Sequence, residues 1–177
     1  DNYQRVLAVY LYLQDTVIYD INEMNRALAG DYHYSDTHNA FGALVNRRAV
    51  CDGIASAVSL LLGKIGIKCM TITGTSAIYG QKKVNHAWNI VEIEGKYYHL
   101  DTTWDISKHS MFDEYAYDYF LQNDENMAFD HDWDVMSAPV CKEDNLSYFS
   151  KNRLFVSNMM QLQQILEHNL EKRNKVF

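Results

Sequence analysis

Three residues of this chain, Cys51, His86 and Asp101, have the types and the order that a cysteine nucleophile needs. A thiol attacks a carbonyl when a base takes its proton and a third group orients that base. Small residues and an apolar helical pattern follow Cys51, so we expect it in the first turn of a helix, where the helix dipole favours a thiolate. The alternative is a buried structural cysteine, because free cysteines are among the most buried residue types.

The histidine and the aspartate stand on two expected strands joined by Glu94-Gly95. If a two-residue turn pairs Ile93 with Lys96, His86 and Asp101 become diagonal neighbours on one side of the hairpin. The Cβ atoms of such neighbours are about 7–8 Å apart or less. A shift of one residue would place the two side chains on opposite faces. The hairpin therefore predicts a contact between the imidazole and the carboxylate.

The periodicity of the remaining sequence predicts an α+β fold, in which the central helix that begins at the cysteine packs on an antiparallel sheet with flanking helices. The expected elements, in chain order, are a helix at 3–19, a short helix and a long loop at 20–39, an apolar turn at 41–45, the central helix at 50–66, strands at 67–75, 84–93 and 96–101, an irregular segment at 102–110, a further strand at 115–121 and a turn at 130–134. We interpret residues 1–177 as one domain, with 142–177 as a hairpin and helix appended to it, which could begin a further unit.

Composition excludes several classes of function. The net charge is −7 and no cluster of Lys and Arg forms a stripe, which argues against a nucleic-acid partner. The longest apolar run, at 57–62, is too short to cross a bilayer. The three cysteines form no CxxC pair and the histidines, with His33 and His38 expected in solvent, are scattered. The acidic turn at 130–134 lacks the glycine and glutamate of a calcium loop. We therefore expect no metal and no cofactor.

Three segments together resemble the motifs of the transglutaminase-like superfamily, with a papain-like fold, and the match is closest to its bacterial branch. They are Val50-Cys51-Asp52-Gly53-Ile54-Ala55, His86-Ala87-Trp88-Asn89 and His99-Leu100-Asp101-Thr102-Thr103-Trp104-Asp105. Weaker similarity extends to 41–45, 117–121 and Asp130-His131, so the motifs span 41–135. The resemblance implies that Cys51 is the nucleophile, His86 the general base and then acid, and Asp101 the orienting carboxylate.

The chain departs from the commoner family pattern at two positions, where Phe41 and Ile54 stand in place of tyrosines. If those hydroxyl groups assist an oxyanion hole, this chain must use the Cys51 backbone N–H and another donor, for which Asn46 is one candidate. Trp88 and Trp104 flank the expected site and are either core or a substrate-binding platform. His99 is expected to be a hydrogen-bonded histidine of the sheet rather than a second base.

The sequence favours a thiol-dependent enzyme that acts on amide bonds, with hydrolysis of a protein or peptide preferred over cross-linking. A cell-wall peptide is one possible substrate, and the family resemblance favours a secreted or cell-surface protein. The alternative is a peptide- or cell-wall-binding module of the same fold that has lost turnover. A redox role for Cys51 is disfavoured because no resolving cysteine lies nearby in sequence. The sequence does not predict the oligomeric state.

Overall fold

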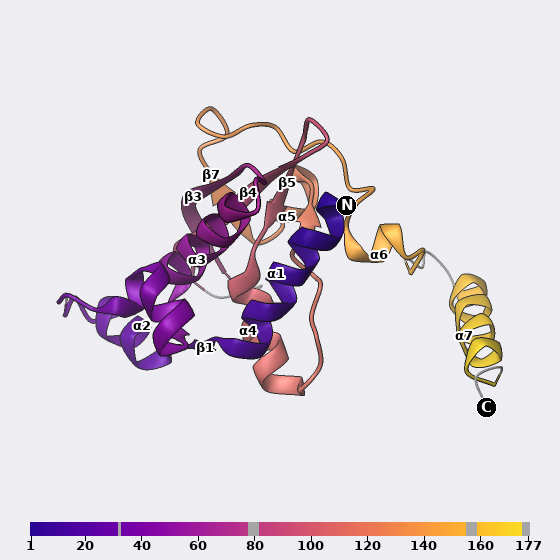
Figure 1. The fold of residues 1–177 in the computed structure, drawn as a ribbon, viewed down its shortest axis with the longest axis horizontal. Coiled ribbons are helices and arrows are strands. Elements are labelled where there is room, and N and C mark those ends of the chain that lie inside the picture. The colour runs from indigo at the N-terminus through magenta and orange to yellow at the C-terminus, as the bar shows by residue number, and fades with distance from the viewer. Residues whose placement is uncertain (32, 78–81, 155–158, 175–177) are drawn as a thin grey trace.

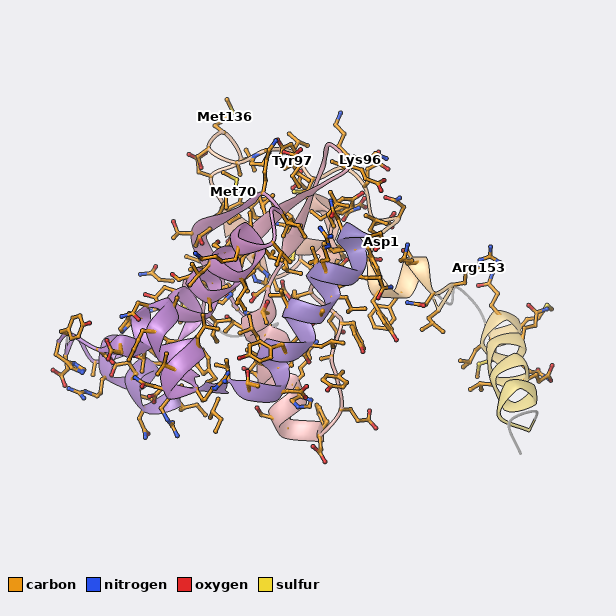
Figure 2. All side chains as sticks on the ribbon, in the orientation of Figure 1. Asp1, Met70, Lys96, Tyr97, Met136 and Arg153 are labelled. Atoms are coloured by element: carbon orange, nitrogen blue, oxygen red, sulfur yellow. The ribbon has the colours of Figure 1, made fainter. Side chains whose placement is uncertain are left out.

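The computed structural model describes residues 1–31, 33–77, 82–154 and 159–174 (Figure 1). Its centre is an antiparallel sheet of five strands in the order β6-β5-β4-β3-β7. The strands are β3 (Cys69–Ser76), β4 (Val84–Ile93), β5 (Lys96–Leu100), β6 (Phe120–Gln122) and β7 (His131–Trp133). The predicted turn is confirmed, because Ile93 pairs with Lys96 and the register continues to Asn89 opposite Leu100. Lys96 marks the outer end of this hairpin (Figure 2).

Three helices cover one face of the sheet and enclose the larger core. They are α1 (Asn2–Thr16), α3 (Cys51–Lys64) and α4 (Thr102–Phe112). Apolar positions at helical spacing direct Val6, Tyr10 and Leu13 of α1 into this core, where they are fully buried. The predicted helices at 3–19 and 50–66 are therefore confirmed to within a few residues. In the part of the chain that the structure describes, no helix is both long and apolar enough to span a membrane.

Short elements connect these helices and carry the chain to the start of α3. They are β1 (Ile18–Tyr19), α2 (Ile21–Leu28), the 3-10 turn η1 (Asp36–His38), the π-helical turn η2 (Gly42–Asn46) and β2 (Arg48–Ala49). β1 and β2 pair in parallel, which places the end of α1 beside the segment that leads into α3. The short helix and the loop predicted for 20–39 are thus observed, and the turn at 41–45 is helical.

The other face of the sheet holds a smaller core of Ile72, Trp88, Ile90, Met127 and Cys141. It is covered by α5 (Asp124–Met127) and by the segment that returns from β7 to Cys141. The tip of that segment carries Met136, which is 90% exposed (Figure 2). The sheet is therefore buried on both faces. The face with the smaller core also carries His86, which is two positions from Trp88 on β4.

Three local predictions are wrong. Residues 102–110, expected to be irregular, form α4, because Asp101 caps that helix. The segment 130–134, expected to be a turn, contains β7, which pairs with β3 at the edge of the sheet. The first arm of the hairpin expected in 142–177 is instead the helix α6 (Tyr148–Lys151), with Ser147 as its cap. Of the strand expected at 115–121, only the last two residues belong to a strand, which is β6.

The C-terminal helix is confirmed as α7 (Met159–Asn174). The sequence also predicts that Ser157 caps this helix and that Leu154-Phe155-Val156 form the second arm of the hairpin, but residues 155–158 lie outside the described residues. The division of the chain into one domain and an appendage stays a prediction.

Gly74 allows β3 and β7 to approach closely. A Cβ atom at this position would lie 2.0 Å from the carbonyl oxygen of Asp132 and 2.9 Å from the ring of Trp88. We expect Gly74→Ala to lower the free energy of unfolding by about 2 kcal/mol or more, because backbone must move to relieve the overlap. Gly63→Ala is the control, since a Cβ there meets no atom within 4 Å and alanine favours the helix. Urea denaturation of both variants measures the difference, and equal stabilities would contradict the prediction.

Candidate active site

Cys51 is the first residue of α3 and is partly exposed. The small residues after it allow close packing, as the sequence predicts: a Cβ atom on Gly53 would lie 2.1 Å from the carbonyl oxygen of Thr37 in η1. The N–H of Val50 also donates to that oxygen, at 3.0 Å. The first turn of α3 is therefore held against η1, and the thiol stands at the positive end of the helix dipole.

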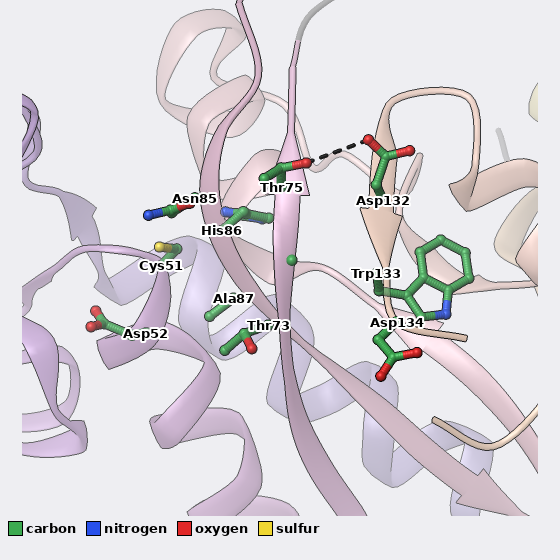
Figure 3. A pocket seen from close by; sticks show the side chains of 11 residues that line it. Cys51, Asp52, Thr73, Thr75, Asn85, His86, Ala87, Asp132, Trp133 and Asp134 are labelled. Atoms are coloured by element: carbon green, nitrogen blue, oxygen red, sulfur yellow. Dashed lines mark hydrogen bonds between the residues drawn. The ribbon is translucent and has the colours of Figure 1, made fainter. Parts of the chain in front are cut away.

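His86 lies next to the thiol, near the start of β4. Its Nε2 is 2.6 Å from Oδ2 of Asp101, and the side chain of Cys51 is near enough to contribute to raising the pKa of the ring. Because Nε2 is engaged by the carboxylate, Nδ1 is the nitrogen available to the thiol, and both residues line the same pocket (Figure 3). Burial alone would lower the pKa of His86, but the Asp101 carboxylate outweighs it and raises this pKa to about 10. The ring is held in its protonated form.

Asp101 is fully buried and caps α4. Its Oδ1 accepts hydrogen bonds from the backbone N–H groups of Thr103 at 2.9 Å and Trp104 at 3.3 Å. Burial opposes ionisation, yet His86 and the other donors hold the pKa of this carboxyl well below its usual range. The predicted contact with His86 is present, but its predicted cause is wrong. Strand pairing ends at Leu100, so the carboxylate reaches the imidazole from a helix cap, not as a diagonal neighbour in the hairpin.

A second imidazole shares the carboxylate. Nε2 of His131, in β7, lies 3.0 Å from the same Oδ2 of Asp101 that His86 contacts. Nδ1 of His131 lies 2.5 Å from Oδ1 of Asp130, whose other oxygen accepts from the hydroxyl group of Tyr119 at 2.6 Å. The sequence predicts neither contact, since it places His131 in a turn. The weak similarity noted at Asp130-His131 is the signal that could have indicated it.

The structure separates the two tryptophans that were candidate substrate-binding residues. Trp88 is 1% exposed, stacks on His86 at 5.7 Å and donates to Nδ1 of His99 at 3.0 Å. It is core, which corrects its assignment as a substrate-binding residue. Trp104 is half-buried and lines a cavity next to Cys51. His99 is a hydrogen-bonded histidine of the sheet, as predicted, because its Nε2 also contacts Asp124 at 2.9 Å.

Two cavities of about 680 Å³ and 540 Å³ meet at Cys51 and share Asp52, Asn85 and His86. The larger one has three acidic side chains in its lining, and Figure 3 shows Asp132 and Asp134 on the far side of it from Asp52. The smaller one is mainly apolar, and its lining includes Tyr19, Met24, Ala27, Leu28, Val50, Val84 and Trp104. The thiol and the imidazole thus lie between an acidic and an apolar hollow. Asn46, the candidate oxyanion donor, is exposed in η2 and is not among the lining residues of either hollow.

His38 corrects another prediction. The sequence places it in solvent without a carboxylate partner, yet its Nδ1 lies 2.8 Å from Asp52 and its Nε2 3.3 Å from Glu23. Burial would lower the pKa of His38, but these two carboxylates together raise it. His38 therefore links η1 to α2 and to the first turn of α3. His33 is also paired, with Glu23 at 3.5 Å.

Two groups of side chains in the described residues bring potential metal ligands within 4.8 Å of one another. One is His86, Asp101 and His131, and the other is His99, Asp124 and Cys141. In the second group, Nδ1 of His99 accepts from Trp88, so Nε2 carries the proton and has no lone pair for a metal. In the first group, hydrogen bonds to Asp101 already occupy both Nε2 atoms. Both groups are better explained as hydrogen-bonded networks than as metal sites.

Asp105 supports the helix that Asp101 caps. It is fully buried, its Oδ2 accepts from the hydroxyl group of Tyr10 and from the N–H of Tyr119, and its Oδ1 has no partner among the described residues. Burial raises its pKa to about 7. The folded chain therefore retains a proton that the unfolded chain releases near pH 4, and this contribution to stability is lost as the pH rises from about 4 to 7.

We accordingly expect Asp105→Asn, which cannot ionise, to gain stability relative to the native chain when the pH is raised from 5 to 8. Urea denaturation at both pH values measures the free energy of unfolding. Asp144→Asn, an exposed replacement of the same type, should show no such change. The prediction would be contradicted if the free energies of unfolding of Asp105→Asn and the native chain differed by the same amount at pH 5 and at pH 8.

Comparisons with known proteins place this chain in a family. A family model described as "Transglutaminase-like superfamily" matches residues 1–102. Among curated proteins, kyphoscoliosis peptidase from Mus musculus is 24% identical over 153 residues, covering 77% of this chain and 22% of that protein. The same peptidase from Homo sapiens is 27% identical over 108 residues, covering 57% of this chain and 15% of that protein. The chain thus spans less than a quarter of these relatives.

Two solved structures also match. One, described as a TGase, aligns over 55% of this chain and 25% of its own, with 23% identity and a TM-score of 0.49. The other, a proposed cysteine protease from Cytophaga hutchinsonii, aligns over 57% and 31%, with 21% identity and a TM-score of 0.44. The curated relatives are mammalian, so the bacterial branch stays a prediction. The family model covers more than half of the chain, and with it the cysteine helix and the histidine–aspartate hairpin, so this chain belongs to the transglutaminase-like superfamily.

Proposed function

We propose that this domain is a thiol-dependent hydrolase of peptide amide bonds, with Cys51 as nucleophile, His86 as general base and acid, and Asp101 as the residue that orients the imidazole. The observation that supports it most strongly is the buried 2.6 Å contact between Nε2 of His86 and Asp101, on a ring that lies next to the thiol. The order of these groups, with the imidazole between the thiol and the carboxylate, is the one that a thiol enzyme needs for its nucleophile, base and orienting group.

In the proposed reaction, the thiol proton has already passed to Nδ1 of His86 before the substrate binds, which gives the imidazolium described above, and the sulfur of the Cys51 thiolate bonds to the carbonyl carbon of the amide. The carbonyl oxygen becomes an oxyanion next to the N–H groups of the first turn of α3. The carbon–nitrogen bond then breaks as His86 returns its proton to the amine, which leaves a thioester on Cys51. Water adds to the thioester with His86 as base, and the carboxylic acid leaves as the thiol is restored.

The hollows on the two sides of the thiol support an extended substrate. A peptide chain that crosses Cys51 would place one flank against Asp132 and Asp134 and the other against Leu28 and Trp104. Such a groove matches a polypeptide better than a small amide, since a small amide would fill only a fraction of either hollow. Trp104 stays a candidate for substrate contact.

The test is a comparison of the native chain with Cys51→Ala on two kinds of substrate: quenched fluorescent peptide libraries, and a glutamine peptide offered with a primary amine. We expect the native chain to cleave peptides and Cys51→Ala to be inactive. Incorporation of the amine without cleavage would establish cross-linking instead. No turnover on either substrate by a chain whose Cys51 also fails to react with iodoacetamide would favour the binding module without turnover.

A further inference from the structure

His131 is the side chain nearest to the proposed triad that the reaction above does not use. It is 1% exposed, lies on a strand at the edge of the sheet, and contacts the same oxygen of Asp101 as the proposed base. Its ring centroid is 5.4 Å from that of His86. The protonation state of a buried imidazole in this position changes the electrostatic potential at His86.

The hydrogen-bonding inventory fixes the protonation of His131. Nδ1 faces an oxygen of Asp130 and Nε2 faces an oxygen of Asp101, and an ionised carboxylate only accepts hydrogen bonds. Although burial opposes ionisation of both carboxyl groups, these hydrogen bonds lower the pKa of each. Both nitrogens of His131 therefore donate, and the ring is an imidazolium, consistent with a pKa that burial lowers but the two carboxylates raise.

The groups around His131 come from several elements. Asp101 and Trp104 lie at the start of α4, and Trp88 and His86 lie on β4. Tyr119 donates to Asp130 from the segment before β6. With Cys51 as a thiolate and His86 protonated, charges alternate in sign along the line Cys51, His86, Asp101, His131 and Asp130. Each buried charge then has an opposite neighbour.

We propose that His131 is a positioning residue of this site, which fixes the Asp101 carboxylate and, as a buried cation, shares its negative charge with His86. The proposal rests on the proposed function. A carboxylate alone would raise the pKa of the His86 imidazolium and make it a weak acid. The leaving amine, however, must receive a proton from that imidazolium. A second cation on the same oxygen weakens the hold of Asp101 on His86.

The experiment measures the rate at which iodoacetate alkylates Cys51 across pH 4–10, since this anion reports both the thiolate and the imidazolium beside it. His131→Gln keeps an N–H donor at the position of Nε2 but carries no charge, whereas His131→Asn cannot reach Asp101. Asp130→Asn removes one of the two negative charges that hold the proton on His131. Asp118→Asn, an exposed change of the same kind away from the site, is the control.

We expect His131→Gln and Asp130→Asn to move the alkaline limb of the profile up by about one pH unit, because His86 loses a cationic neighbour. His131→Gln should keep the maximal rate within about threefold, and His131→Asn should lose about 10- to 100-fold, as expected for one charge-assisted hydrogen bond. Asp118→Asn should match the native profile. If His131→Asn does not fold, as judged by circular dichroism, the other two variants decide.

An alkaline limb that is the same in the native chain, His131→Gln and Asp130→Asn would overturn the inference and leave the proposed function intact. A native Cys51 that alkylates no faster than an unstructured thiol would overturn both. A third outcome is a lower maximal rate in His131→Asn, a native rate in His131→Gln and no shift of the alkaline limb in either. It would show that His131 only holds Asp101 in place, and would overturn the charge-sharing part.

Discussion

Replacing Asp101 by Asn is expected to lower peptide cleavage by about 10³- to 10⁴-fold while the chain stays folded. Asparagine keeps the oxygen that caps α4 through Thr103 and Trp104, so the helix should persist. Its amide group, however, donates to Nε2 of His86 where the carboxylate accepts. The imidazole then carries its proton on Nδ1, the nitrogen that faces the thiol, and cannot take the proton of Cys51.

Steady-state turnover of a cleaved peptide, with circular dichroism and thermal unfolding, checks this prediction. Asp105→Asn is the matched control, because it alters another buried aspartate of α4 that makes no contact with His86. It should keep turnover within a few-fold of the native value. Native-like turnover of Asp101→Asn would show that the contact with His86 is structural only.

Replacing His86 by Ala is expected to abolish the selective alkylation of Cys51 by iodoacetamide at pH 6. An ordinary thiol is only about 0.3% ionised at this pH. A thiol that loses its base should therefore react about 100-fold more slowly. Peptide mapping by mass spectrometry after timed exposure gives the rate at each cysteine.

The chain contains its own controls for this experiment. Burial raises the pKa of Cys69 to about 11, and it raises that of Cys141, which is 1% exposed, even further. Neither should react appreciably in the folded protein, native or variant, and both should react after denaturation. Equal labelling of Cys51 in the native chain and in His86→Ala would mean that the imidazole does not activate the thiol.

Much of the frame could be predicted from the sequence, because its patterns are local. The helix that begins at Cys51 follows from helical periodicity, and the Glu94-Gly95 turn sets the register of its hairpin. The thiol, the imidazole and the carboxylate were predicted to meet, and the structure places them together. The way in which Asp101 reaches His86 was not predicted. Asp101 directly follows a strand and caps a helix, and a periodic pattern of apolar residues does not reveal a single capping residue.

The contacts that the sequence did not reveal are those that join distant segments. The three residues of β7 are too short for a pattern of alternation, so His131 has no local signal of its position beside Asp101. His38 likewise precedes Asp52 by 14 positions and Glu23 lies on another helix, so only tertiary packing brings the three together. The burial of Trp88 could not be predicted either, because Met127, Trp133 and Cys141, which pack in the same core, lie far from it in the sequence.

The place of β7 at the margin of the sheet bears on where this protein can be divided. A fragment that stops at residue 102, where the family match ends, would hold all three proposed catalytic positions. It would still lack the edge strand β7, the segment that covers Trp88, and His131, the second imidazole on the Asp101 carboxylate. We therefore expect the smallest fragment that folds on its own to extend at least through Cys141, some forty residues beyond the end of the family match.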